Sequence, residues 1–112
     1  MGCLFCNIVA GEIPSEKVHE TDTVLAFKDI NPGAPTHVLV IPKEHIVSAQ
    51  ELTAEHAELL AEMFGVMAKI ASDAGLTGGH RIVTNIGSDA GQTVQHLHFH
   101  VIGGRDLSWP PG

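Results

Sequence analysis

The sequence lacks the features that would place it in a membrane, on a nucleic acid or outside the cell. No apolar run approaches the roughly 20 residues of a transmembrane helix. The first residues lack the basic start and long apolar stretch of a signal peptide. The 6 Lys and Arg are outnumbered by 13 Asp and Glu, for a net charge of −7, so a basic surface for nucleic acid or an anionic membrane is not expected. We therefore predict a cytoplasmic protein that binds neither.

Internal repeats, low-complexity segments and linkers are also missing. The chain has 112 residues, of which 44% are apolar and 17% charged. This length and composition are typical of one folded domain and argue against disorder. We predict a single domain over residues 1–112, small enough to leave apolar surface for self-association.

Cysteine is scarce, since Cys3 and Cys6 are the two in the chain. In a reducing compartment such a pair is expected as free thiols or metal ligands, not as a structural disulfide. Thiolates at this spacing suit tetrahedral zinc, but they supply two of its four ligands. Histidines from elsewhere in the chain would have to complete such a site.

Five stretches read as strands and one as a long helix. The strands are predicted from β-branched and apolar residues between turn signals, at residues 17–20, 23–29, 37–42, 81–87 and 97–103. The third is almost continuously apolar and ends at Pro42, which is typical of a central strand buried on both faces. Apolar residues at helical spacing predict a helix over 53–74, with Thr53 as N-cap and Gly75 as C-cap. A short helical turn is expected to end near Gly11. Consecutive strands with one long helix indicate an α+β domain with an antiparallel sheet.

Three histidines, His96, His98 and His100, alternate with apolar residues in the last predicted strand. Successive side chains of a strand point to opposite faces, so the three are expected to share one face. The apolar residues between and after them would pack on the other face, against the long helix. Imidazole serves as base, nucleophile or metal ligand near neutral pH. The pattern therefore predicts a polar cleft or a metal site, with a solvated strand face as the alternative.

The loop before this strand, residues 85–95, is rich in Gly, Ser, Thr, Asn and Gln. Glycines let backbone N–H groups approach an anion, and hydroxyls and amides add donors. Such loops are most often plain turns, but the position beside the histidines predicts a phosphate cradle. His19, His56 and His80 have no comparable setting and are predicted to be surface residues.

The stretch QHLHFHV (95–101) resembles the His-φ-His-φ-His-φ-φ signature, with φ apolar, of the histidine triad (HIT) superfamily. The similarity continues, in order, through GEIPSEKVHETD, AFKDINPGAPTHVLVIPKEHI and NIGSDAGQTVQHLHFHVIGGRDLSWPPG. The final WPPG is similar to the Hint branch, the purine nucleoside phosphoramidases. The resemblance implies a five-stranded antiparallel sheet with one long helix and a short N-terminal helix. It also implies a homodimer that joins two such sheets into a ten-stranded one.

The same resemblance implies an activity. Hint proteins bind purine nucleoside monophosphates and hydrolyse P–N bonds, such as that of adenosine 5'-phosphoramidate, through a covalent nucleotidyl-histidine. By position in the family motifs, His98 is the expected nucleophile and His100 a phosphate contact. His37 and His96 would assist proton transfer to the leaving amine. This chemistry requires no metal or cofactor.

The resemblance also assigns the nucleotide contacts. The phosphate and leaving group would be held by Asn85, Gly91, Gln92, Thr93 and Val94. Position 93 is often Ser in the family, so the extra methyl of Thr93 could change how leaving groups fit. Asp29 would accept hydrogen bonds from the ribose hydroxyls. The apolar slot for the base would comprise Phe5, Ile8, Ile13, Phe27 and Ile30, and Trp109 would reach toward the partner subunit's site.

Some bacterial HIT proteins carry a Cys-x-x-Cys and a histidine after Pro-Lys, and they bind a structural zinc through two Cys and two His. The matching residues here are Cys3, Cys6, His45 and His96. His96 thus has two candidate roles that exclude each other, zinc ligand and proton relay. The sequence leaves the choice open.

Two alternatives to a phosphoramidase remain. One is a dinucleoside polyphosphate hydrolase of the related Fhit-like branch, which has glutamine at the place of His100. The other is a non-enzymatic module that binds nucleotide or zinc and acts through a protein partner. The intact triad and the WPPG terminus favour the phosphoramidase.

Overall fold

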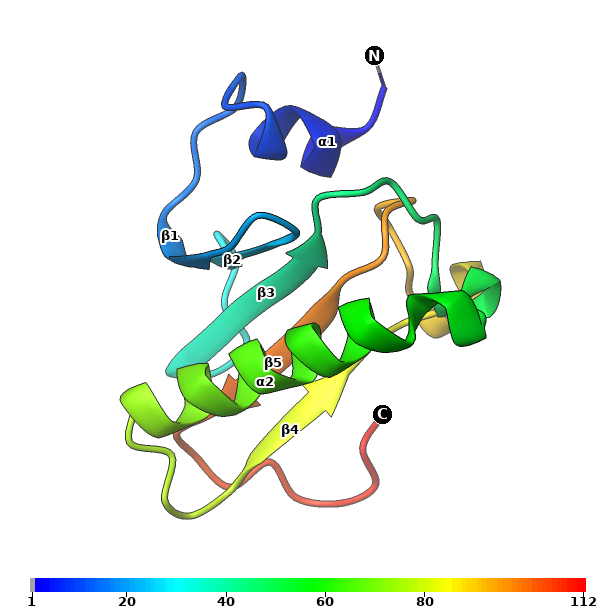
Figure 1. Cartoon of the computed structure of the whole chain (residues 1–112). Helices are drawn as coiled ribbons and strands as arrows, with labels where there is room; N and C mark the ends of the chain where they lie inside the picture. The colour runs from blue at the N-terminus through cyan, green and yellow to red at the C-terminus, as the bar shows by residue number, and fades with distance from the viewer. Residues whose placement is uncertain (1) are drawn as a thin grey trace.

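The computed structural model describes residues 2–112 and shows one antiparallel sheet with a helix on each face (Figure 1). The helices are α1 (Leu4–Val9) and α2 (Ala57–Asp73). The strands are β1 (Lys17–Glu20), β2 (Val24–Lys28), β3 (Thr36–Pro42), β4 (His80–Val83) and β5 (Phe99–Gly103). Short 3-10 turns occupy Ala49–Glu51, Ala54–His56 and Ser88–Ala90. The predicted α+β architecture is confirmed.

The strand order is β1-β2-β3-β5-β4, so β3 lies at the centre and β4 at one edge. β3 pairs with β2 along its length, for example Phe27 with Leu39, and with β5, for example Val40 with Phe99. Every residue of β3 from Val38 to Pro42 is buried. The prediction of a central strand that ends at Pro42 is therefore confirmed.

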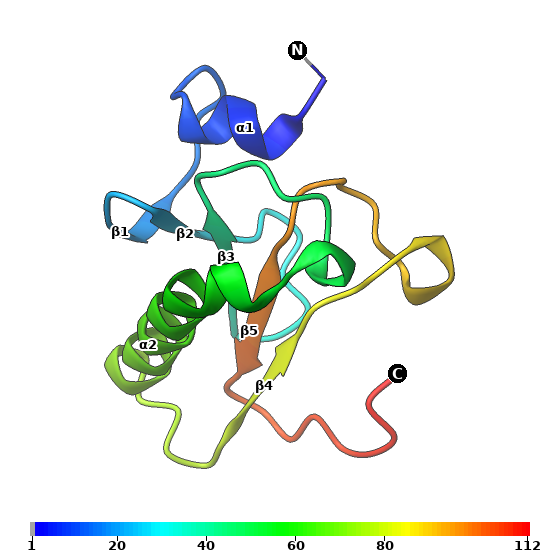
Figure 2. The ribbon, with the colours of Figure 1, turned by 45° about the vertical axis from the view of Figure 1, so that its right-hand side comes forward.

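Each face of the sheet has its own apolar core. On one face, α2 contributes Met63, Met67 and Ile70 to a cluster with strand residues such as Leu97 and Val101. On the other face, Phe5 and Ile8 of α1 pack with residues of β2 and β3, namely Leu25, Phe27, Leu39 and Ile41. In both ribbon views α1 stands apart from α2 (Figures 1 and 2). The face under α1 is the one that carries the histidines.

The long helix starts later than predicted. A 3-10 turn occupies 54–56, and α2 begins at Ala57. Thr53 caps that turn as expected, since its Oγ1 accepts from Glu55 N at 3.2 Å. His56, predicted as a plain surface residue, is half-buried and completes the cap by accepting from Thr53 N at 2.9 Å. Gly75 follows the helix with a positive φ of 71°, a conformation that glycine adopts without strain.

The last two strands are shorter than predicted, because β4 ends at Val83 and β5 begins at Phe99. Beyond this point the regular ladder is replaced by other hydrogen bonds. Thr84 Oγ1 donates to His98 O at 2.8 Å, and Leu97 N donates to Ile46 O at 2.6 Å. His96 and His98 therefore lie on an irregular segment just before β5, although their side chains still fall on the α1 face as predicted. Among residues 2–112, no helix is long and apolar enough to cross a membrane.

Candidate functional site

A cavity of about 310 Å³ opens on the α1 face of the sheet. Its apolar wall comes from α1, the following loop and the central strands, through Leu4, Phe5, Ile8, Ile13, Pro14, Phe27, Ile30, Leu39 and Val94. Its polar lining comprises Ser15, Lys28, Asp29, Asn31, Thr93, His98 and His100. All five predicted base-slot residues are thus in one cavity with Asp29 and two histidines of the triad. The shape, apolar on one side and polar on the other, suits a ligand with an apolar ring and a polar end.

His98 is buried at the polar side of this cavity, and one hydrogen bond fixes its tautomer. Its Nδ1 lies 2.8 Å from the carbonyl oxygen of His96. A carbonyl can only accept, so Nδ1 carries the hydrogen and donates it. The neutral ring then has a free lone pair on Nε2, which is the nucleophilic form of imidazole.

His100 is linked to a second histidine. The backbone N–H of Gly33 donates to His37 Nδ1 at 2.9 Å, so the hydrogen of His37 sits on Nε2. That Nε2 lies 2.8 Å from His100 Nδ1 and 3.3 Å from Asp29 Oδ2. His100 Nδ1 therefore accepts, and its own hydrogen is on Nε2.

The pKa of His100 is lowered to about 4, first by burial and then by the nearby His98 and His37, with Asp29 opposing the shift. His100 is thus neutral near pH 7 in the free protein. A bound phosphate would favour its protonated form, because an opposite charge nearby stabilises imidazolium.

Four residues from three distant segments form a compact donor set, the thiol–imidazole cluster: Cys3, Cys6, His45 and His96. Their ligand atoms all lie within 4.8 Å of one another. Cys3 Sγ and His96 Nδ1 are 3.3 Å apart, as are Cys6 Sγ and His45 Nδ1. Cys6 Sγ is 3.6 Å from His96 Nδ1. Zinc bonds to sulfur and nitrogen imply ligand atoms roughly 3.3 to 3.8 Å apart in a tetrahedron, so the donor set fits this ion.

Both ring nitrogens of His96 are engaged, one facing the cluster and the other in a hydrogen bond to the backbone. The residue is fully buried, and its Nε2–H donates to the carbonyl of Pro42 at 2.8 Å. Nδ1 is then unprotonated and faces the two thiols. Burial lowers the pKa of His96, which keeps it neutral and able to coordinate. His96 does not line the cavity, so the geometry favours the ligand role over the proton relay.

The pKa of the Cys6 thiol also points to a cation in this cluster. Its pKa is raised by burial and then by the neighbouring Cys3. Two thiolates so close together repel each other, and a cation between them would offset that repulsion. The donor set of two sulfurs and two imidazoles fits the ligands of a structural zinc site.

Four residues predicted to contact the nucleotide do not line the cavity: Asn85, Gly91, Gln92 and Trp109. The amide of Gln92 is used within the loop. It accepts from Gly87 N at 2.9 Å and donates to Val47 O and Val94 O at 2.8 and 3.1 Å. Both amide hydrogens are engaged, so Gln92 shapes the loop that presents Thr93, and its contact with a phosphate stays a prediction.

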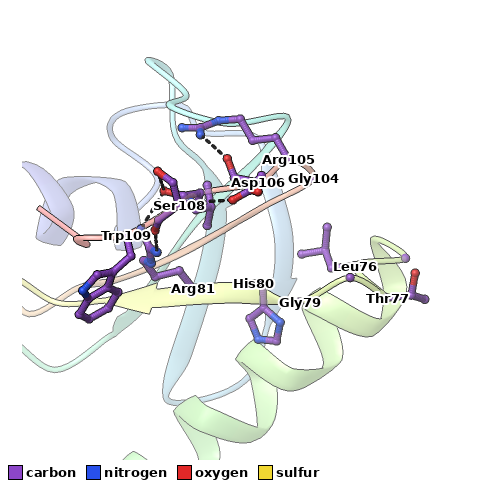
Figure 3. Close-up of a pocket in the computed structure, with 13 residues that line it drawn as sticks. Leu76, Thr77, Gly79, His80, Arg81, Gly104, Arg105, Asp106, Ser108 and Trp109 are labelled. Atoms are coloured by element: carbon purple, nitrogen blue, oxygen red, sulfur yellow. Dashed lines mark hydrogen bonds between the residues drawn. The ribbon is translucent and has the colours of Figure 1, made fainter.

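Trp109 lies in a different hollow, of about 910 Å³, between the loop after α2 and the C-terminal tail (Figure 3). Its side chain is 80% exposed. The tail is held near β4 because Arg81 donates to the carbonyls of Leu107 and Ser108. On its own subunit Trp109 is therefore remote from the cavity, and its contact with a partner stays a prediction.

Some lining residues escaped sequence reasoning. Leu39 could have been found, because it is two residues from His37 in one predicted strand and so shares its face. Leu4, beside Phe5 at the start of α1, gave no separate signal. Thr84 does not line the cavity, but its hydroxyl replaces a ladder hydrogen bond at the backbone of His98.

Comparison with known proteins identifies the family. A family model described as Scavenger mRNA decapping enzyme C-term binding matches residues 2–108. An uncharacterized HIT-like protein of Synechococcus elongatus is 50% identical over 109 residues, which is 97% of this chain and 96% of that protein. The chain belongs to the histidine triad family. The 14 kDa zinc-binding protein of Zea mays is 43% identical over 111 residues, which is 97% of this chain and 87% of that protein.

Solved structures of HIT proteins agree in fold. A HIT family hydrolase from Legionella pneumophila Philadelphia 1 superposes with a TM-score of 0.97 at 47% identity, covering 99% of this chain and 100% of its own. Another, from Clostridium thermocellum, gives a TM-score of 0.94 at 45% identity, covering 97% and 96% of the two chains. The predicted HIT fold is thus confirmed, whereas the Hint branch stays a prediction.

Proposed function

We propose that this HIT protein is a purine nucleotide phosphoramidase with His98 as the nucleophile. The observation that carries the proposal is the bond from His98 Nδ1–H to His96 O, which leaves Nε2 unprotonated at the edge of the cavity. The names of two structural relatives, both HIT family hydrolases, support a hydrolytic role.

The nucleotide would lie with its base against the apolar wall and its phosphate toward the histidines. Phe5, Ile8 and Phe27 are buried and offer ring and methyl surface to a purine. Asp29, at the rim, would accept hydrogen bonds from the ribose hydroxyls. Thr93 and His100 would donate to phosphate oxygens, the latter through Nε2–H.

The reaction would proceed in two displacements. His98 Nε2 attacks the α-phosphorus and the P–N bond breaks. The amine leaves with the bonding electron pair and takes a proton from His100, which the bound phosphate has favoured in its protonated form. The nucleotidyl-imidazole ring carries a positive charge, which the His96 carbonyl stabilises through Nδ1–H.

Water completes the cycle. It attacks the phosphorus, the bond from phosphorus to Nε2 breaks, and the nucleoside monophosphate leaves. One proton of the water returns to His100, so the enzyme is restored. While His100 is neutral, His37 orients it by donating Nε2–H to its Nδ1 at 2.8 Å.

Zinc is the proposed occupant of the thiol–imidazole cluster. Cys3, Cys6, His45 and His96 would hold it, and it would supply a cross-link between α1 and the sheet. None of its donors reaches the reacting atoms. The name of the maize relative, a zinc-binding protein, supports the assignment. Elemental analysis of the purified chain, with near one zinc per chain expected, tests it.

A homodimer is proposed through β4, because an edge strand has unpaired backbone groups that a second copy can pair with. Such pairing would give the ten-stranded sheet that the family resemblance implies. It would also place the exposed Trp109 near the partner. Sedimentation of the full chain tests the dimer, and the cytoplasmic location stays a prediction.

The decisive experiment is intact-mass analysis during turnover of adenosine 5'-phosphoramidate, quenched rapidly. The expected result is a species heavier by one nucleotidyl group, mapped to His98. Diadenosine polyphosphate is offered in parallel, and faster turnover of it would favour the Fhit-like alternative. AMP binding without any adduct from either substrate would favour the non-enzymatic module.

A further inference from the structure

The short helix α1 takes part in two sites at once. Cys3 and Cys6 turn their sulfurs toward the histidines of the thiol–imidazole cluster, at 3.3 Å each. Phe5 and Ile8 turn the other way and line the cavity. Helical periodicity explains the division, because residues three apart share a face of a helix.

Nothing within α1 itself fixes its place on the sheet. A helix of six residues is too short to be stable alone. Its backbone hydrogen bonds are local, such as Asn7 N to Cys3 O and Ala10 N to Cys6 O, both at 3.0 Å. The position of α1 therefore depends on side-chain contacts, among which are the packing of Phe5 and Ile8 and the thiol–imidazole cluster.

The cluster also reaches the reactive histidine. His96 is two residues before His98 and accepts the His98 Nδ1–H bond through its carbonyl. Phe5 lies between Cys3 and Cys6 in the sequence. Its ring is edge-on to those of His96 and His98, with centroid distances of 5.9 and 5.1 Å. Phe5 thus contacts both His98, which lines the cavity, and His96, which belongs to the cluster.

We propose that metal occupancy of the thiol–imidazole cluster sets the nucleotide affinity of the cavity, with Cys3 and Cys6 acting as positioning residues through α1. The inference rests on the proposed nucleotide site. With a metal joining the thiolates to the two imidazoles, α1 is fixed and Phe5 and Ile8 complete the wall. Without it, α1 loosens, and a ligand must order the helix as it binds, which lowers its affinity.

Such coupling is reciprocal, because both ligands favour the same ordered α1. If the metal tightens AMP binding by some factor, AMP tightens metal binding by that factor. We expect about tenfold, within the usual range of coupling between two sites.

The test compares the full chain loaded with Zn²⁺ and the same chain stripped by a chelator, with metal content checked by elemental analysis. Calorimetry is expected to show a Kd for AMP about tenfold higher in the stripped state. Competition with a metal indicator is expected to show the Kd for Zn²⁺ falling by that same factor when AMP is saturating. Hydrogen exchange is expected to rise in residues 3–13 after stripping, while α2 and β3 stay protected.

Two variants sharpen the test. Phe5→Leu keeps all four ligands but removes the ring that touches both histidines, so Zn²⁺ should still bind while the ratio of the two AMP Kd values falls. Lys69→Ala is the matched control, because it removes an exposed side chain of α2 that belongs to neither site. Its ratio should equal that of the unmodified chain.

Equal AMP Kd values in the two states of the unmodified chain overturn the coupling and leave the phosphoramidase proposal intact. Exchange that rises throughout the sheet also overturns it, because the metal would then stabilise the whole fold. A chain that binds no Zn²⁺ refutes it together with the zinc site. If AMP binds in neither state, the proposed function is refuted. This outcome differs from loss of coupling because no Kd for AMP can be measured at all.

Discussion

Residues 96–101 alternate between the two faces of the sheet, and the two sets of side chains are stabilised in different ways. Leu97, Phe99 and Val101 face α2 and are 1%, 6% and 0% exposed. His96 and His98, on the α1 face, are equally buried at 0% and 6%. Burial alone therefore does not distinguish core from site.

The difference lies in how each face is satisfied. The apolar face is stabilised by contact area, which has no direction. The histidine face requires a hydrogen-bond partner for each fully buried nitrogen, and among residues 2–112 no fully buried side-chain nitrogen or oxygen lacks one. Those partners also determine the tautomer of each ring. On this face, the contacts that pack the histidines therefore also set their chemical state.

The strongest test of the comparison is His98→Asn. The amide can keep a hydrogen bond near the His96 carbonyl but cannot attack phosphorus. Turnover of adenosine 5'-phosphoramidate should fall by about 10³-fold or more, as for loss of a nucleophile. Calorimetry should still show AMP binding, and the urea midpoint should change little. Substantial residual turnover would contradict the assignment of His98.

Its neighbour Leu97 should behave in the opposite way. Leu97→Ala removes a buried side chain from the α2 core, so the free energy of unfolding should fall by about 2–5 kcal/mol. Urea denaturation measures this. Ile86→Ala, at a side chain that is 43% exposed, is the control and should cost far less. Equal losses at the two positions would show that the α2 face is not the main core.

Thr84 joins the two faces at the point where the ladder ends. Thr84→Val removes the hydroxyl that donates to His98 O while keeping the shape. One lost hydrogen bond of about 1 kcal/mol should lower kcat by roughly three- to tenfold with little change in KM. Thr84→Ser should restore most of the rate. A loss of stability without a loss of kcat in Thr84→Val would limit the hydroxyl to a structural role.

The remaining test of the comparison is the acid sensitivity of the histidine face. His100, faced by His98, His37 and Asp29, has a folded pKa of about 4, below the ordinary 6.5. The unfolded chain therefore binds more protons between these values, and stability should fall as pH drops from about 6.5 to about 4. His100→Gln should show a shallower fall in urea midpoint over this window. An identical slope would mean that His100 is not the group responsible.

Much of this protein could be predicted from the sequence, because the relevant signals are local. The apolar run of β3 predicted its central place, and helical spacing predicted α2. The alternation from His96 to Val101 predicted two faces, since side-chain direction follows from the period of extended chain. The spacing of Cys3 and Cys6 predicted a metal-type pair.

Other features depended on where distant segments meet. Gln92 seemed a phosphate donor by composition, but folding engages its amide with Val47 and Val94. The strand ends shifted because Thr84 and Ile46 supply bonds that no local pattern encodes. The long helix was predicted to start at residue 53 but begins at Ala57, after a 3-10 turn. The two kinds of helix have nearly the same apolar spacing, so the sequence pattern does not separate them.

The sequence by itself determined that three histidines share a face opposite an apolar one, because alternation is a property of neighbouring residues. The tertiary structure alone decided what each ring does. His96 is bonded by the Pro42 carbonyl, His98 by the His96 carbonyl and His100 by His37. These contacts determine which nitrogen of each imidazole carries the hydrogen. His96 faces the thiols and His98 faces the cavity because a hydrogen bond acts between atoms that meet in space, wherever they lie along the chain.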